Sequence, residues 1–123
     1  MRPRILYIQH RHSILSSTLH RLEQIGFAAM GVQSVPSALD LMRVALPDCI
    51  LLALDCPQCE LQHFLAEYAN MRPVPLCAMR TDDNSQSYMN ERKYSAYFHS
   101  IIDTTTDSDE LKRHFSEFTS NRR

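Results

Sequence analysis

Residues 47–57 read Pro-Asp-Cys-Ile-Leu-Leu-Ala-Leu-Asp-Cys-Pro. Six consecutive apolar residues, Cys49–Leu54, lie between an aspartate and the polar turn that begins at Asp55. A continuous apolar run of this length is typical of a strand that is covered on both faces, as in the centre of a parallel sheet. The stretch therefore predicts a buried central strand, followed by a loop that contains Asp55, Cys56 and Pro57.

Strand-like and helix-like segments alternate on both sides of this strand. The alternation predicts a parallel sheet with right-handed crossovers and helices on both faces. The expected fold is a three-layer α/β/α sandwich around a five-stranded, doubly wound sheet of the flavodoxin type. In such sheets ligands bind beyond the carboxyl ends of the strands. The expected strands are 5–8, 27–32, 49–54, 74–79 and 97–102, and the expected helices are 13–25, 34–46, about 59–68, 83–93 and a last one capped by Asp107 or Ser108.

Length and charge restrict the classes of function. The chain has 123 residues, of which 44% are hydrophobic, and this fits one domain over 1–123 with a single core. Thirteen basic residues nearly balance fourteen acidic ones, so we expect no direct binding of nucleic acid. The chain contains no apolar run of about 18 residues, and the apolar run 5–8 is too short for a signal peptide. We therefore expect a cytoplasmic protein with reduced thiols and no membrane association.

The order of these segments resembles the response-regulator receiver domain family. Residues 47–57 resemble the family's "PDLILLD" strand, which is followed four residues after its aspartate by a proline. Residues 4–8 resemble its first strand, 74–79 its fourth and 96–99 its fifth. The resemblance covers essentially the whole chain and rests on this order. It implies a receiver-like domain of the kind that often stands at the N-terminus of transcriptional regulators, with an output segment beyond Arg123.

The resemblance also implies that each chemical residue of the family is replaced. Phosphoryl transfer to a carboxylate needs a nucleophilic oxygen, a hard cation held by oxygen ligands, and a positive charge near the developing anion. A chain without these groups is a degenerate member, or pseudo-receiver, and not an enzyme. The magnesium-binding acidic pair falls on Gln9 and His10, the acceptor aspartate on Ala53, the Thr/Ser position on Arg80 (or on Ala78), the lysine on Ser100 and the switch aromatic on Tyr97.

Two other residues near this site leave alternatives open. Asp55, two residues past Ala53, is either a substitute phosphoacceptor or a loop residue that caps the next helix, and we favour the cap. Arg80 either donates to an anion above the sheet or is a solvated loop arginine, and we favour the latter.

The Cys56-Pro57-Gln58-Cys59 motif has three interpretations. A Cys-x-x-Cys at a helix N-terminus resembles the glutaredoxin motif, but it lies too late in the chain for a thioredoxin-like fold. His63 follows Cys59 by four residues, so these two and Cys56, with His10 or His12 as the fourth ligand, would suit zinc. The simplest interpretation is that Cys56 packs as a small apolar residue and Cys59 has no role.

We expect a signalling module that binds protein and is not phosphorylated, with no cofactor. The alternative is a metal- or redox-sensing domain that uses Cys56, Cys59 and His63. The family resemblance implies that a protein partner, or a second copy of the chain, binds the face formed by the fourth helix, fifth strand and fifth helix. This face corresponds to 83–93, 97–102 and 109–118.

Overall fold

A computed structural model describes residues 2–81 and 85–120, and its centre is a five-stranded parallel sheet. The strand order is β2-β1-β3-β4-β5, so the strand of the opening stretch is central, as predicted. Every residue of that strand, β3, is buried. The strands are β1 (Arg4–Ile8), β2 (Ala28–Val32), β3 (Cys49–Ala53), β4 (Leu76–Arg80) and β5 (Ser100–Asp103).

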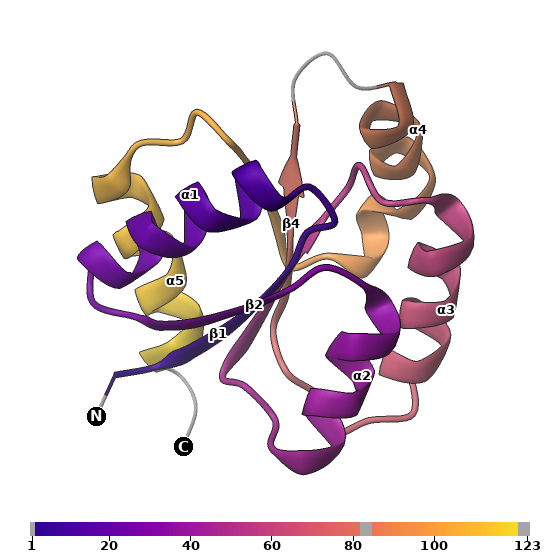
Figure 1. Ribbon diagram of the computed structural model, residues 1–123, viewed down its shortest axis with the longest axis horizontal. Coiled ribbons are helices and arrows are strands. Elements are labelled where there is room, and N and C mark those ends of the chain that lie inside the picture. The colour runs from indigo at the N-terminus through magenta and orange to yellow at the C-terminus, as the bar shows by residue number, and fades with distance from the viewer. Residues whose placement is uncertain (1, 82–84, 121–123) are drawn as a thin grey trace.

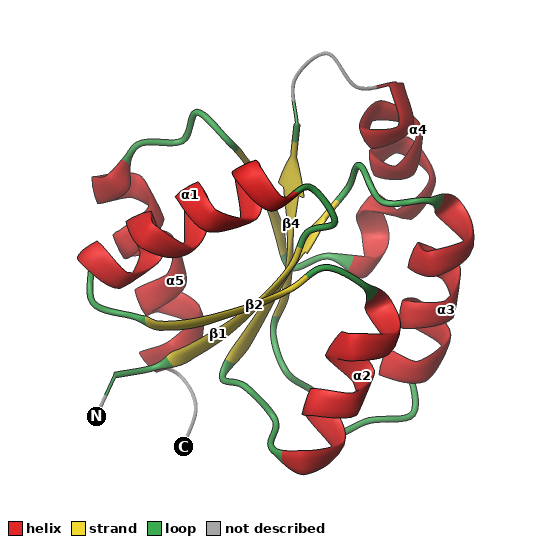
Figure 2. Ribbon diagram, in the orientation of Figure 1, coloured by secondary structure: helices red, strands yellow, loops and turns green. Residues whose placement is uncertain are grey.

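Five α-helices cover the two faces of the sheet and form the expected three layers (Figures 1 and 2). Figure 1 shows α1 and α5 together on one side, and α2, α3 and α4 on the other. The helices are α1 (His12–Gln24), α2 (Val35–Val44), α3 (Gln58–Tyr68), α4 (Ser85–Tyr94) and α5 (Ser108–Ser120), with one turn of 3-10 helix, η1 (Ser95–Tyr97), before β5.

The alternation of side chains along each strand divides the core in two. On one face, Leu52 packs with Phe64 of α3 in a cluster that α2 also joins. On the other face, Tyr7 and Ala53 pack with Phe115 of α5 in a cluster that includes α1. The central strand thus contributes to both cores.

Two glycines fit α1 onto the sheet. Gly26 follows α1 and has a φ of 106°, a backbone conformation that residues with a side chain rarely adopt. Gly31 of β2 lies directly beneath α1, where an added Cβ would come within 2.6 Å of Leu15 Cδ1 and 2.7 Å of Leu19 Cδ1. Glycine at 31 therefore lets α1 approach β2 closely, and a larger residue would have to push these leucine side chains aside.

The prediction that residues 97–102 form the fifth strand is wrong at both ends. Tyr97 belongs to η1, and β5 begins at Ser100 and ends at Asp103. The apolar pair Tyr97-Phe98 looked like the start of a strand in the sequence. In the structure, Phe98 instead packs against the α2–α3 core from outside the sheet. Arg80, the last residue of β4, pairs in register with Asp103, which fixes where β5 ends.

The first residues of the helices lie closer to their predicted positions than the first residue of the fifth strand does. Ser34 caps α2 by accepting a hydrogen bond from the backbone N–H of Ser37, and Asp107 caps α5 by accepting one from that of Glu110. The first helix begins at His12, one residue before the expected cap Ser13. Asp83, where the fourth helix was expected to begin, and Arg123 lie outside the described residues.

Candidate functional site at the carboxyl edge of the sheet

The carboxyl ends of β1 and β3 lie side by side, as predicted. Ile8 pairs in register with Leu52, so Gln9 and His10 follow β1 next to the end of β3 at Ala53. The Ala53 side chain is fully buried in the α1–α5 core. A methyl group therefore stands at the end of the central strand, and it offers no oxygen to a ligand.

A buried ion pair joins the two loops that follow these strands. Asp55 Oδ2 accepts a 2.9 Å hydrogen bond from Arg11 Nε, and His10 Nδ1 lies 3.9 Å from Asp55 Oδ1. The Asp55 side chain is 0% exposed, whereas that of Arg11 is 42% exposed. Among the described residues, no group donates a hydrogen bond to Oδ1. Arg11 thus compensates the charge of a carboxylate that water does not reach.

The expectation that Asp55 caps the third helix is wrong. The N-cap residue of α3 is Pro57, and its side chain makes no cap hydrogen bond. Asp55 instead turns back toward Arg11, which precedes α1. The reason is electrostatic, because a buried carboxylate gains more from a guanidinium than from a backbone N–H.

Gln9 is a structural residue of the β1–α1 loop. It is 1% exposed, its Nε2 donates to the Tyr7 hydroxyl at 3.2 Å, and its Oε1 accepts from the Arg11 backbone N–H at 3.0 Å. Burial raises the pKa of Tyr7, so its hydroxyl stays neutral and available to accept this bond. The Gln9 amide is therefore already used within the chain and is a poor candidate for a metal ligand.

Asn90 fixes the β3–α3 loop from across the site. This buried residue of α4 donates through Nδ2 to the carbonyl oxygens of Leu54, at 2.8 Å, and Cys56, at 2.9 Å. Sequence reasoning missed Asn90, because α4 is a polar helix with little apolar periodicity. No local signal in the sequence distinguishes one buried asparagine from its exposed neighbours.

Arg80 is not a solvated loop arginine. It is the last residue of β4, and its Nε and one Nη each donate to a carboxylate oxygen of Glu91 on α4 at 2.8 Å. Asp103 Oδ2 lies 4.0 Å from the other Nη. A guanidinium already bound in this bidentate way is poorly placed to bind an anion above the sheet.

The residue at the carboxyl edge of β5 is Asp103 and not the expected Ser100. Ser100 is the first residue of β5 and pairs with Cys77, at the opposite end of the strand from the site. Asp103 accepts hydrogen bonds from the backbone N–H and hydroxyl of Thr105, and these bonds keep the Asp103 pKa below its ordinary value. Tyr97, the expected switch aromatic, lies outside β5 and is exposed.

The structure does not gather the expected metal ligands. Cys56 is buried with the α2–α3 core, whereas Cys59 is exposed. In the described ranges 2–81 and 85–120, no three His, Cys, Asp or Glu side chains, Cys56, Cys59, His63 and His10 included, form a group that could hold a metal ion. Burial, with the nearby Asp55 and Glu60 carboxylates, raises the pKa of Cys56 to about 12. A thiol that stays protonated at neutral pH is a poor nucleophile, which also disfavours the redox interpretation.

We expect the two cysteines of the motif to differ sharply in stability tests. Cys59→Ser should change the free energy of unfolding by less than about 0.5 kcal/mol, because the thiol is exposed. Cys56→Ser should cost about 1–3 kcal/mol, because it buries a hydroxyl among apolar side chains. Urea denaturation with and without a strong chelator measures both values. A chelator that destabilises the unmodified protein would show that a metal joins the two thiols.

The raised pKa of Cys56 predicts how the stability of the protein changes with pH. The folded pKa of Cys56, about 12, lies above the ordinary value of 9.0, so the folded state holds its proton more tightly. The contribution of Cys56 to stability is therefore complete below pH 9 and declines as the pH rises from about 9 toward 12. The difference in unfolding free energy between the unmodified protein and Cys56→Ala, followed across this range, should decrease. A difference that stays constant up to pH 11 would contradict the raised pKa.

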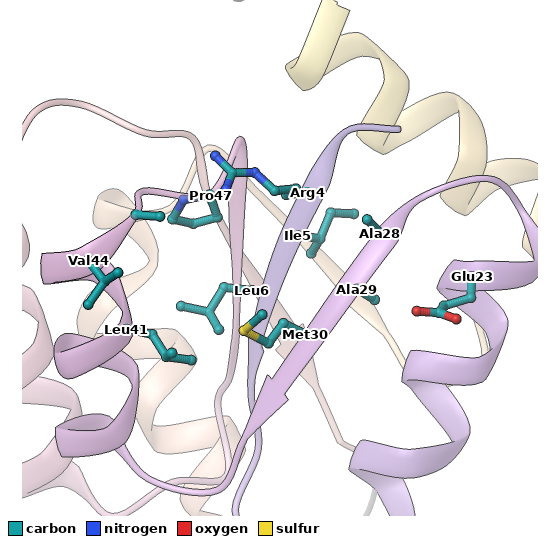
Figure 3. Close-up of a pocket in the computed structure, with 11 residues that line it drawn as sticks. Arg4, Ile5, Leu6, Glu23, Ala28, Ala29, Met30, Leu41, Val44 and Pro47 are labelled. Carbon is teal, nitrogen blue, oxygen red and sulfur yellow. The ribbon is translucent and has the colours of Figure 1, made fainter. Parts of the chain in front are cut away.

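An apolar cavity of about 300 Å³ lies away from this edge, near the amino ends of β1 and β2. Figure 3 shows Leu6 and Met30 from the sheet and Leu41 and Val44 from α2 around it. Met30 and Val44 are exposed at its rim. Its walls are mostly aliphatic, in contrast to the polar groups at the carboxyl edge.

Comparisons with solved structures assign the fold to the receiver class. A response regulator receiver protein from Burkholderia phymatum superposes with a TM-score of 0.78 at 17% identity, with 97% of this chain and 96% of that chain covered. A CheY-like receiver domain from Methylobacillus flagellatus gives 0.74 at 15%, with 96% and 99% covered. A receiver domain protein from Clostridium thermocellum gives 0.78 at 14%, with 96% and 94% covered.

The chain therefore has the CheY-like receiver fold, with the strand order of that class. No family model and no curated protein matches the sequence. Among the described residues, no helix is long and apolar enough to cross a bilayer.

Proposed function

We propose that this chain is a pseudo-receiver, a signalling module that acts through protein binding and accepts no phosphoryl group. The observation that carries the proposal is Ala53, a buried methyl at the carboxyl end of the central strand. Transfer from a phosphoryl donor to a receiver requires a carboxylate oxygen that is exposed to the donor and to a magnesium ion. Ala53 has no such oxygen, and the neighbouring Gln9 amide is already bonded within the chain.

Asp55 does not supply the missing acceptor. Its side chain is fully buried, and one oxygen is engaged by Arg11. The other oxygen, Oδ1, is buried as well, so a phosphoryl donor could reach it only if the loop that Asn90 holds through two carbonyl groups opened. The burial of Asp55 and its ion pair with Arg11 therefore favour a structural role for this residue.

The surface around α4 supports protein binding. Tyr88 and Met89 on α4 and Tyr97 on η1 are 61%, 59% and 57% exposed. We call these three residues the α4 patch. Large apolar side chains that are exposed are candidates for contact with a protein partner. The α4 patch belongs to the face that binds partners according to the receiver resemblance. We propose this patch as the contact surface for a protein partner or a second copy.

Sedimentation of the chain over a concentration series tests this mode of action. A module that works without phosphorylation should sediment identically with and without acetyl phosphate and Mg²⁺. If two copies associate through the α4 patch, the double variant Tyr88→Ser, Met89→Ser should weaken association. The control Val44→Ser, at an even more exposed apolar site on α2, should not. A change in association that requires acetyl phosphate and is lost in Asp55→Asn would contradict the proposal.

A further inference from the structure

A second cavity, of about 290 Å³, lies at the carboxyl edge between α1 and the segments that follow β4 and β5. Its lining is mostly polar, whereas the lining of the cavity near α2 is mostly apolar. Ala53 does not line it, whereas Arg11, the partner of Asp55, does. The polar residues that line it are Arg11, Ser17, Thr18, Arg21, Thr81 and Thr104.

Among the described residues, the lining of this cavity contains two arginines and no carboxylate. Arg11 is neutralised by Asp55, but Arg21 has only neutral acceptors, because its guanidinium donates to the carbonyl oxygens of Thr104, at 3.3 Å, and Thr106. In residues 2–81 and 85–120, no carboxylate lies within ion-pair distance of Arg21. Asp103 precedes the Thr104 carbonyl, yet its nearest cation is Arg80, at 4.0 Å.

A buried hydroxyl without a partner lies in the same cavity. Thr81 is 5% exposed and its Oγ1 makes no hydrogen bond within the described part of the chain, although its backbone N–H donates to Ser87 Oγ. Buried polar atoms are nearly always hydrogen-bonded, so an exception calls for an explanation, and one explanation is a site for a ligand, ion or water. Thr18 also lines the cavity and is buried, and its hydroxyl interacts with Tyr7. Thr81 is thus the donor that the fold leaves unused.

We propose that this cavity binds a small oxyanion of the phosphate class without a covalent bond. Arginine presents planar N–H groups that match phosphate oxygens, and the Thr81 hydroxyl supplies a further donor. The volume lies at the lower limit of small-molecule pockets, which suits inorganic phosphate or a small phosphate ester rather than a nucleotide. This role is independent of the proposed pseudo-receiver function, because the anion stays intact and no residue is modified.

Phosphate binding is measured by calorimetric titration of the full chain with inorganic phosphate, and sodium chloride at equal ionic strength corrects for screening. We expect saturable binding by the unmodified protein. Thr81→Val and Arg21→Gln should each weaken it at least about tenfold, since each removes a hydrogen bond to a charged ligand. The matched control Arg43→Gln, which removes an exposed arginine of α2, should leave affinity unchanged.

Thr81→Val decides the test, because Arg21 also holds the β5–α5 connection. Valine keeps the shape of threonine and removes the unpaired hydroxyl, so this variant should fold at least as stably as the unmodified protein without phosphate. Loss of binding together with retained or increased thermal stability supports the site. The proposal is overturned if phosphate acts no differently from chloride, or if Thr81→Val binds phosphate as tightly as the unmodified protein. Either result leaves the pseudo-receiver proposal untouched.

Discussion

Leu52→Ala should lower the free energy of unfolding by roughly 2–5 kcal/mol, the range that is typical of leucine truncation in a closed core. Leu52 is fully buried in the central strand, and strands lie on both sides of β3, so neighbouring atoms cannot readily collapse into the space. Equilibrium urea denaturation measures the loss. The control Val44→Ala removes methyl groups from an exposed site on α2 and should change stability by less than about 0.5 kcal/mol.

A loss below about 1 kcal/mol for Leu52→Ala would contradict the packing described for β3. It would mean that the strand lies nearer the surface than the sheet order implies, or that the core relaxes around the missing atoms.

Ala53→Asp should cost about 3–5 kcal/mol at neutral pH, and it should not create a phosphoacceptor. The new carboxylate would enter the apolar core that Tyr7, Met79 and Phe115 share, and Arg11 is already paired with Asp55. Because burial disfavours the charged form, the new carboxyl should have a raised pKa, and the deficit should shrink as the pH falls below that pKa.

Ala53→Asn is the matched control, with nearly the same shape and no charge. Unfolding curves at pH 7 and pH 5 should show a pH-dependent deficit for the aspartate variant and a constant one for the asparagine variant. An aspartate variant that is as stable as the unmodified protein and gains a phosphoryl group would show that the site needs only this one residue.

The sequence predicts the sheet well because its strands are apolar runs separated by helices, and Ser34 and Asp107 cap two of these helices. Cys49–Ala53, the five central residues, are buried as the continuous run indicated. The fifth strand was misplaced because Tyr97 and Phe98 look strand-like in isolation. Its true end depends on the pairing of Asp103 with Arg80, and that contact joins two separate βα units.

The site was harder to predict, because its contacts join residues far apart in the chain. Arg11 and Asp55 are 44 residues apart, and Asn90 reaches the carbonyl oxygen of Leu54 across 36. The sequence predicts a replacement at each chemical position, Ala53 among them. It could not show how the replacements bond to one another, since buried polar contacts leave no periodic pattern.

Intact mass spectrometry of the chain shows whether this receiver fold accepts a phosphoryl group. The full chain is incubated with acetyl phosphate and Mg²⁺, beside a receiver domain that is known to be phosphorylated. We expect the mass of this chain to stay unchanged while the control gains one phosphoryl group. An added phosphoryl group that disappears in Asp55→Asn would overturn the pseudo-receiver proposal, and it would make Asp55 the acceptor.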